Sequence, residues 1–156
     1  MSWIGRIASA LWPTPSGLEV DEPEAMTLAV APPYGRVFRA LDALLGPGTV
    51  LYWEGKAGPI MAAWLDRISA EPRPAFAIGV VPVPDFYHIP LDAEVLEGLA
   101  QRVELPNAID GRVRLHAYLN QRIVWQWRPA FGPTPMLISR RLPDYRTGEF
   151  LRALSD

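Results

Sequence analysis

The 156-residue sequence contains no cysteine, only two histidines and a single lysine. Without cysteine the chain forms no disulfide, no cysteine-ligated zinc site and no iron–sulfur cluster, and it has no thiol nucleophile. The two histidines, His88 and His116, are too few for a three-histidine metal site. We therefore expect a protein with no bound metal and no cofactor.

Long apolar runs and an excess of positive charge are also missing. No stretch approaches the ~20 apolar residues of a membrane span, and Ile7–Trp12 is shorter than a signal-peptide core. The net charge of −2 argues against a nucleic-acid binder, whose affinity depends on neutralising phosphates. We expect a soluble cytoplasmic protein that binds neither nucleic acid nor a membrane.

The chain is long enough for one domain with a sizeable core. Its mass is 17.4 kDa, and hydrophobic residues make up 49% of it. A domain of this size buries roughly 68–70% of the surface of its unfolded chain. Proline accounts for 17 residues, which disfavours coiled coils and bundles of long helices.

The first 33 residues differ from the rest. Residues 2–12 have helical spacing of apolar side chains, including Trp3 and Trp12 on one face. This arm would pack on its own domain or on a second copy, and an interfacial membrane anchor is the alternative. Residues 13–34 are rich in proline and acidic side chains, as in an extended linker, with a possible edge strand at Met26–Ala31. We place a single compact domain at residues 34–156.

Within that domain, helical and strand patterns alternate. The predicted elements, in order, are helix 35–45, strand 49–53, helix 59–70, strand 76–83, helix 92–103, a hairpin at 112–128, strand 136–139 and helix 144–154. This order predicts an α/β (or α+β) fold. Its mixed central sheet would have about five or six strands flanked by helices, because helices between strands indicate parallel crossovers in the first half. The second half would be an antiparallel meander.

The first candidate site is the junction between strand 49–53 and the helix that follows it. Gly55, Lys56 and Gly58 form a loop that opens the helix. Amide groups at a helix start attract anions, and Lys56 would add a full positive charge. No phosphate-binding glycine motif is present, so a plain two-glycine turn is the alternative.

The second candidate is the proline-rich segment after strand 76–83. Asp85 could orient His88 for acid–base chemistry, and Glu54 would lie near them if the two strands were parallel neighbours. A proline-stiffened connector with a hydrogen-bonded histidine is the alternative.

The third candidate is the hairpin. A two-residue turn at Asn120-Gln121 predicts one polar and aromatic face and one apolar face. A slip of one residue would exchange the two faces. The first face would be either a second core or a docking surface for a protein, a second copy or stacked bases. Its candidate interaction residues, together with those of the arm, are Arg114, His116, Tyr118, Trp125, Trp127, Trp3 and Trp12.

No stretch carries a catalytic signature. The features favour a non-catalytic module that binds a protein partner, a second copy of itself or a small ligand. The alternative is a small enzyme in which Asp85 and His88 form the acid–base pair and Glu54 and Lys56 lie near the substrate. That alternative requires the loops at 54–58 and 84–90 to meet in one cleft.

Overall fold

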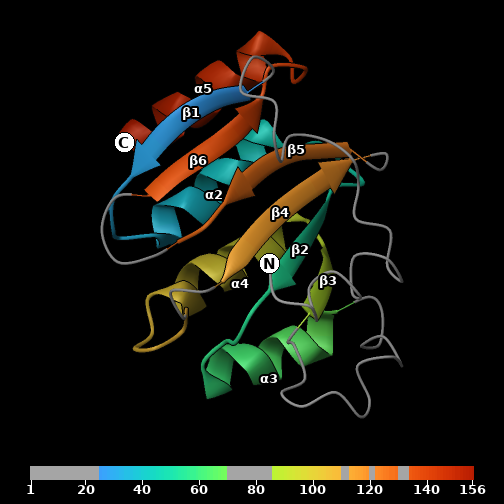
Figure 1. The fold of residues 1–156 in the computed structure, drawn as a ribbon, viewed down its shortest axis with the longest axis vertical. Coiled ribbons are helices and arrows are strands. Elements are labelled where there is room, and N and C mark those ends of the chain that lie inside the picture. The colour runs from blue at the N-terminus through green and yellow to red at the C-terminus, as the bar shows by residue number, and fades with distance from the viewer. Residues whose placement is uncertain (1–24, 70–85, 110–112, 120–121, 130–133) are drawn as a thin grey trace, which may run out of the picture.

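The structure is a computed structural model that describes residues 25–69, 86–109, 113–119, 122–129 and 134–156 (Figure 1). These segments hold helices and strands in alternation, ending in a run of three strands and a helix. The elements are β1 (Ala25–Val30), α2 (Gly35–Leu44), β2 (Val50–Glu54), α3 (Pro59–Ile68), β3 (Phe86–Pro90), α4 (Ala93–Val103), β4 (Arg114–Leu119), β5 (Arg122–Trp127), β6 (Thr134–Ser139) and α5 (Asp144–Ser155).

The six described strands form one sheet in the order β1-β6-β5-β4-β2-β3. This confirms the predicted α/β class with a sheet, flanking helices and an antiparallel C-terminal meander. The predicted parallel crossover is wrong among the described strands, because all their pairings are antiparallel. β2 lies between β3 and β4 and runs opposite to both.

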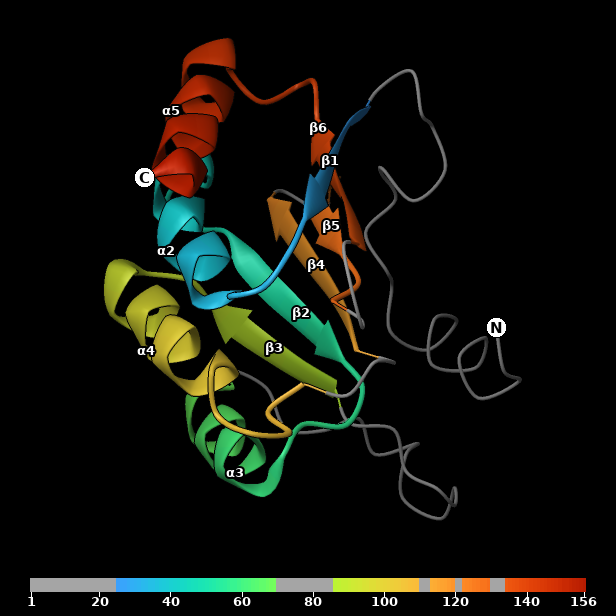
Figure 2. The same cartoon turned by 90° about the vertical axis from the view of Figure 1, so that its left-hand side faces the viewer.

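The four described helices cover one face of this sheet (Figure 2). They follow one another in the order α5, α2, α4 and α3 from the β1 edge to the β3 edge. The described part of the chain is therefore a two-layer arrangement of helices on a sheet. The opposite sheet face is not covered by any of these four helices.

Local sequence signals account for the helix boundaries. Asp92 caps α4 as predicted, with its carboxylate accepting a hydrogen bond from the Val95 N–H at 2.8 Å. The Gly46-Pro47-Gly48 loop ends α2 and contains Gly48 at a φ of 82°, a left-handed conformation that favours glycine. The predicted helices at 35–45, 59–70, 92–103 and 144–154 agree with α2, α3, α4 and α5 to within two residues at each end.

Three tryptophans form the centre of the core between the two layers. Trp53, Trp125 and Trp127 are each 0% exposed. Phe38 of α2 lies with its ring centroid 6.1 Å from that of Trp127, which joins the helix layer to the sheet. Large aromatic side chains contribute strongly to burial, so this cluster fixes how the sheet sits on the helices.

A β-bulge decides which side chains of the hairpin face the core. Leu119 pairs with Arg122 and Tyr118 with Ile123, as the two-residue turn predicts, but Ala117 then pairs with Trp125. Val124 is the extra residue on β5, and it shifts the register by one position. The predicted polar and aromatic face is therefore wrong for its two tryptophans, which lie on the core face.

Several predicted features fall outside the described residues. These are the apolar arm and most of the linker, strand 76–83, and Asp85. β1, predicted as a strand at 26–31, pairs along six residues with β6. The sheet thus begins at Ala25, before the predicted domain start at Tyr34. β3 occupies part of the segment interpreted as a proline-stiffened connector.

Candidate functional site

Five of the predicted site residues lie together on the face of the sheet opposite the helices. Tyr52 of β2 pairs with His88 on one side and with His116 on the other. The same face holds Glu54, which pairs with Arg114, two positions along the strand. Tyr118, opposite Val50, continues it. The predicted members of this face are Glu54, His88, Arg114, His116 and Tyr118.

Four of its side chains form a contiguous group, called here the ring cluster: Tyr52, His88, His116 and Tyr118. The Tyr52 ring meets His88 edge-on with centroids 5.1 Å apart, and it lies nearly parallel to His116 at 6.1 Å. The Tyr118 hydroxyl and His88 Nδ1 form a hydrogen bond of 3.0 Å. Because Tyr52 stands between the two imidazoles, they are arranged for ring packing rather than for shared ligation of a metal.

The imidazole of His116 is neutral near pH 7. It is 3% exposed, and burial lowers its pKa to about 4, with further lowering by the positive charges of Arg128 and Arg114. A neutral ring can pack against Tyr52 without the cost of burying a charge. Gln126, its partner on β5, is also buried, and Gln126 Oε1 has no hydrogen-bond partner in the described part of the chain.

Of the predicted acid–base pair of Asp85 and His88, only His88 lies among the described residues. His88 Nδ1 is bonded to Tyr118. The backbone N–H and C=O of His88 both bond the Ser69 hydroxyl at 3.3 Å. Glu54 pairs with Phe86, so the end of β2 meets the start of β3. The proximity of Glu54 to this segment follows from an antiparallel pairing, not from the parallel one expected.

The predicted anion loop is tied into the fold at Gly58. The Gly58 N–H donates to the Ala108 carbonyl at 3.2 Å. A Cβ at position 58 would lie 2.4 Å from the Asn107 carbonyl oxygen, so only glycine fits there. Lys56 is exposed, and Gly55 has a φ of 124°. Anion binding at Gly55 and Lys56 stays a prediction, with the Gly58 amide already bonded.

The predicted interaction surface loses its two largest members. Trp125 and Trp127 are fully buried on the helix-facing side of the sheet, because the bulge at Val124 turns them inward. They are core residues and present no surface to a partner. Trp3 and Trp12 lie outside the described residues.

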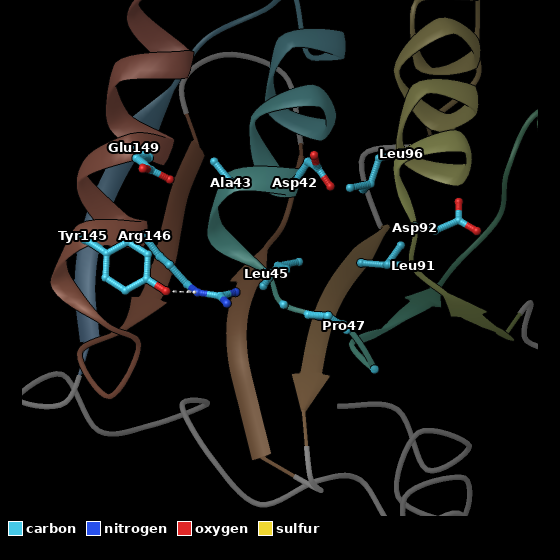
Figure 3. Close-up of a pocket in the computed structure, with 12 residues that line it drawn as sticks. Asp42, Ala43, Leu45, Pro47, Leu91, Asp92, Leu96, Tyr145, Arg146 and Glu149 are labelled. Atoms are coloured by element: carbon cyan, nitrogen blue, oxygen red, sulfur yellow. Dashed lines mark hydrogen bonds between the residues drawn. The ribbon is translucent and has the colours of Figure 1, made fainter.

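A groove on the helix layer was not predicted. It has a volume of about 670 Å³ and lies where the C-terminal end of α2 meets the N-terminal turns of α4 and α5 (Figure 3). Its lining combines leucines with charged side chains at the rim. The lining residues are Asp42, Ala43, Leu45, Gly46, Pro47, Gly48, Leu91, Asp92, Leu96, Tyr145, Arg146 and Glu149.

Hydrogen bonds hold the loop beneath the groove. The Thr49 hydroxyl donates to the Gly46 carbonyl at 2.7 Å, and the Leu91 N–H donates to the Thr49 carbonyl at 3.0 Å. Thr49 is buried. These bonds connect the end of α2 to the segment that leads into α4, so the groove floor is built on fixed backbone.

Arg146 of α5 reaches across the groove to the end of α2 (Figure 3). Its Nη1 would lie 2.7 Å from a Cβ at position 46, so Gly46 leaves the space that the guanidinium occupies. Its Nε donates to the Tyr145 hydroxyl at 3.2 Å. A positive charge at the C-terminal end of a helix also meets the negative end of the helix dipole, which favours this placement.

No local pattern in the sequence predicts this groove. Its lining comes from three helix ends that are far apart in the chain, and each end has an ordinary structural explanation of its own. Asp92 is a helix cap, Gly46 ends a helix, and Arg146 lies in the first turn of α5. Only the packing of α2 between α4 and α5 brings them together.

Comparison with known proteins adds no assignment. No family model, no curated protein and no solved structure matches this chain. The described residues contain no group of three or more histidine and acidic side chains placed to hold a metal ion. None of the helices in the described segments has both the length and the apolar character that crossing a membrane requires. The ring cluster and the groove are therefore the two regions whose geometry bears on function.

Proposed function

We propose that this protein is a non-catalytic module that binds a small ligand in the groove between α2, α4 and α5. The observation that carries the proposal is the groove itself. Its volume of about 670 Å³ lies within the ~300–1,000 Å³ typical of small-molecule sites. Its lining also has the usual composition, with an apolar floor and a few polar groups to orient a ligand.

Rigid elements support the site. Leu45 and Leu96 line the floor, and both are buried in the core packing of α2 and α4. Leu91 is tied through its N–H to Thr49. A site on such elements is largely formed before the ligand arrives, so little affinity is lost to ordering the protein.

Of the two kinds of non-catalytic binding considered, binding of a small ligand is favoured over binding of a protein partner. The interaction hypothesis depended on a broad aromatic surface, and burial of Trp125 and Trp127 removes most of that surface. The enzyme alternative depends on Asp85 beside His88, whose Nδ1 already bonds Tyr118. The groove needs neither feature.

The test is a screen of soluble small metabolites by two-dimensional amide NMR on the full chain. We expect at least one compound to shift the amide signals of groove residues. Ala43→Trp should fill the groove and weaken each such compound at least about tenfold. Ala63→Trp is the matched control, because Ala63 is exposed on α3 and does not line the groove.

Two results would overturn the proposal. One is a screen in which no compound shifts the groove signals. The other is a set of binders whose affinity Ala43→Trp leaves unchanged. Arg146→Glu provides a second variant in case Ala43→Trp lowers the melting temperature, because it changes the charge of the groove without filling it.

A further inference from the structure

Two charged side chains of opposite sign line the groove from neighbouring helices. Arg146 enters from α5, the helix that also carries Glu149, and Asp42 lies on the side of α2 that faces α4 and Leu96 (Figure 3). Leu45 lies between them, and Leu91 lies beyond Asp42 on the side of Asp92. From Arg146 to Asp42 the groove thus has a positive group, an apolar side chain and a negative group in sequence.

Arg146 is held in place yet keeps most of its bonding capacity. A guanidinium carries five N–H donors. Among the described residues, the hydrogen bond that Arg146 makes through its side chain is the one from Nε to Tyr145. Glu149 lies one turn further along α5 without pairing with it, since the ion pair within 4 Å in the described segments is Arg39–Glu97. The guanidinium fork remains able to bind a carboxylate through two parallel bonds.

The carboxylate of Asp42 is likewise uncompensated. It has no hydrogen bond and no ion pair within the described segments. Asp92, nearby on α4, spends one oxygen on its helix cap. A ligand with one negative and one positive group is favoured over a ligand with a single charge. A single charge is attracted by one of the two side chains, Arg146 and Asp42, and repelled by the other.

We propose, on the basis of the function proposed above, that the ligand is a small zwitterion with its charges at opposite ends. Its carboxylate binds Arg146, its ammonium group binds Asp42, and a short aliphatic spacer lies on Leu45. An ω-amino acid has this chemistry, whereas an α-amino acid carries both charges at one end.

A series of six-carbon probes tests the proposal on the full chain at low salt. The probes are 6-aminohexanoate, hexanoate, hexylamine and norleucine, and amide NMR titrations give their dissociation constants. We expect 6-aminohexanoate to bind about two- to fivefold more tightly than each of the others, since an exposed ion pair contributes up to about a factor of five. Shorter ω-amino acids, beginning with 4-aminobutyrate, then measure the spacing.

Two variants test which side chain binds which charge of the ligand. Arg146→Gln should weaken 6-aminohexanoate and hexanoate about two- to fivefold and leave hexylamine unchanged. Asp42→Asn should weaken 6-aminohexanoate and hexylamine and leave hexanoate unchanged. Asp66→Asn is a matched control, because Asp66 is an exposed aspartate on α3 away from the groove.

The outcomes distinguish failure of the zwitterion inference from failure of the proposed function. Equal binding of all four probes, or tighter binding of norleucine, overturns the zwitterion inference while groove binding itself stands. The same holds if screened metabolites bind the groove and none of the four probes does. If Ala43→Trp leaves every affinity unchanged, the proposed function fails as well.

Discussion

The two faces of the sheet are made by the same strands but stabilise the protein in different ways. On the helix-covered face, Trp53, Trp125 and Trp127 pack among aliphatic side chains with no exposed surface. On the opposite face, Tyr52 and His116 stack as rings, and polar groups are buried beside them. Adjacent residues on one strand, such as Tyr52 and Trp53, serve opposite faces because strand side chains alternate.

Burial alone therefore does not identify a core. Trp53 and His116 are both nearly inaccessible, yet their burial differs in cost. Burial of the Trp53 ring is favourable, because its indole N–H donates to the Gly55 carbonyl, whereas burial of the two His116 nitrogens, which form no hydrogen bond within the described segments, is costly. The helix-covered face should therefore dominate the free energy of unfolding. The ring-cluster face should instead make that free energy depend on pH and on single hydrogen bonds.

Deleting Val124 tests the bulge alone, because it removes the extra residue without exchanging the two faces. Without Val124, Ile123 still pairs with Tyr118 and Trp125 follows it directly opposite Ala117, so both tryptophans keep the core face. We expect a folded protein whose free energy of unfolding is about 1–3 kcal/mol lower, because a buried valine side chain is lost and the strand readjusts locally.

Val124→Ala is the control for that deletion. It keeps the bulge and shortens a buried side chain, so it should cost about 1–3 kcal/mol and leave a cooperative melt. Near-UV circular dichroism of the tryptophans should be close to that of the wild type for both variants. A deletion variant that loses the cooperative melt or the tryptophan signals would show that the bulge itself is needed to hold the tryptophans in the core.

Trp125→Ala compared with Tyr52→Ala measures the difference between the faces directly. Truncating a fully buried tryptophan should lower the free energy of unfolding by about 3–5 kcal/mol. The half-buried Tyr52 should cost less, about 1–2 kcal/mol. Urea denaturation at pH 7.5 gives both values. Equal losses for the two variants would mean that the ring cluster is a second core of the same strength.

The bulge also marks the limit of prediction from this sequence. The hairpin position, its two-residue turn and its first two pairs follow from the sequence pattern and are confirmed. Arg114, His116 and Tyr118 were correctly placed on one face. Trp125 and Trp127 were not, because Val124 fits a regular strand as well as a bulge. The choice depends on how tryptophans pack against α2, which no local signal records.

Two other differences between the predicted and the observed structure also arise from packing that no local signal records. Helices between strands usually indicate parallel crossovers, but here β3 lies in the segment before α4 and pairs antiparallel with β2. Pro84 ahead of the strand and Pro90 at its end concealed the alternation of Tyr87 and Ile89 toward the core. The groove, in turn, is a product of helix packing, so its charged residues had no common pattern along the chain.

Acid should destabilise the protein through His116. In the unfolded chain this imidazole has a pKa of about 6.5, whereas in the folded chain its pKa is about 4. The unfolded state therefore binds more protons between these values, and stability falls as the pH is lowered through that window. We expect a loss of about 2–3 kcal/mol between about pH 7 and 4.5 from this residue.

His116→Gln isolates this contribution. Other titrating groups are common to both proteins, so the difference between their pH profiles in urea denaturation reports His116 alone. The variant should lose less stability than the wild type on acidification. Identical slopes would indicate that His116 has the same pKa in the folded and the unfolded chain, so that burial does not lower it.

The smallest effect should come from Tyr118→Phe, which removes one hydroxyl from the ring-cluster face. That hydroxyl bonds His88 Nδ1 at 3.0 Å, and a neutral hydrogen bond contributes about 0.5–1.5 kcal/mol. Tyr145→Phe is the matched control, because Tyr145 is 62% exposed and its hydroxyl bonds Arg146 at the surface. We expect the control to change stability by less than about 0.5 kcal/mol.

A double-mutant cycle decides whether this effect belongs to the His88–Tyr118 pair. His88→Gln and Tyr118→Phe should each destabilise the protein, and the double variant should lose less than their sum, since the pair is broken only once. Additive losses would mean that the hydroxyl acts through some other contact. The ring-cluster face would then be held by ring packing without a contribution from this hydrogen bond.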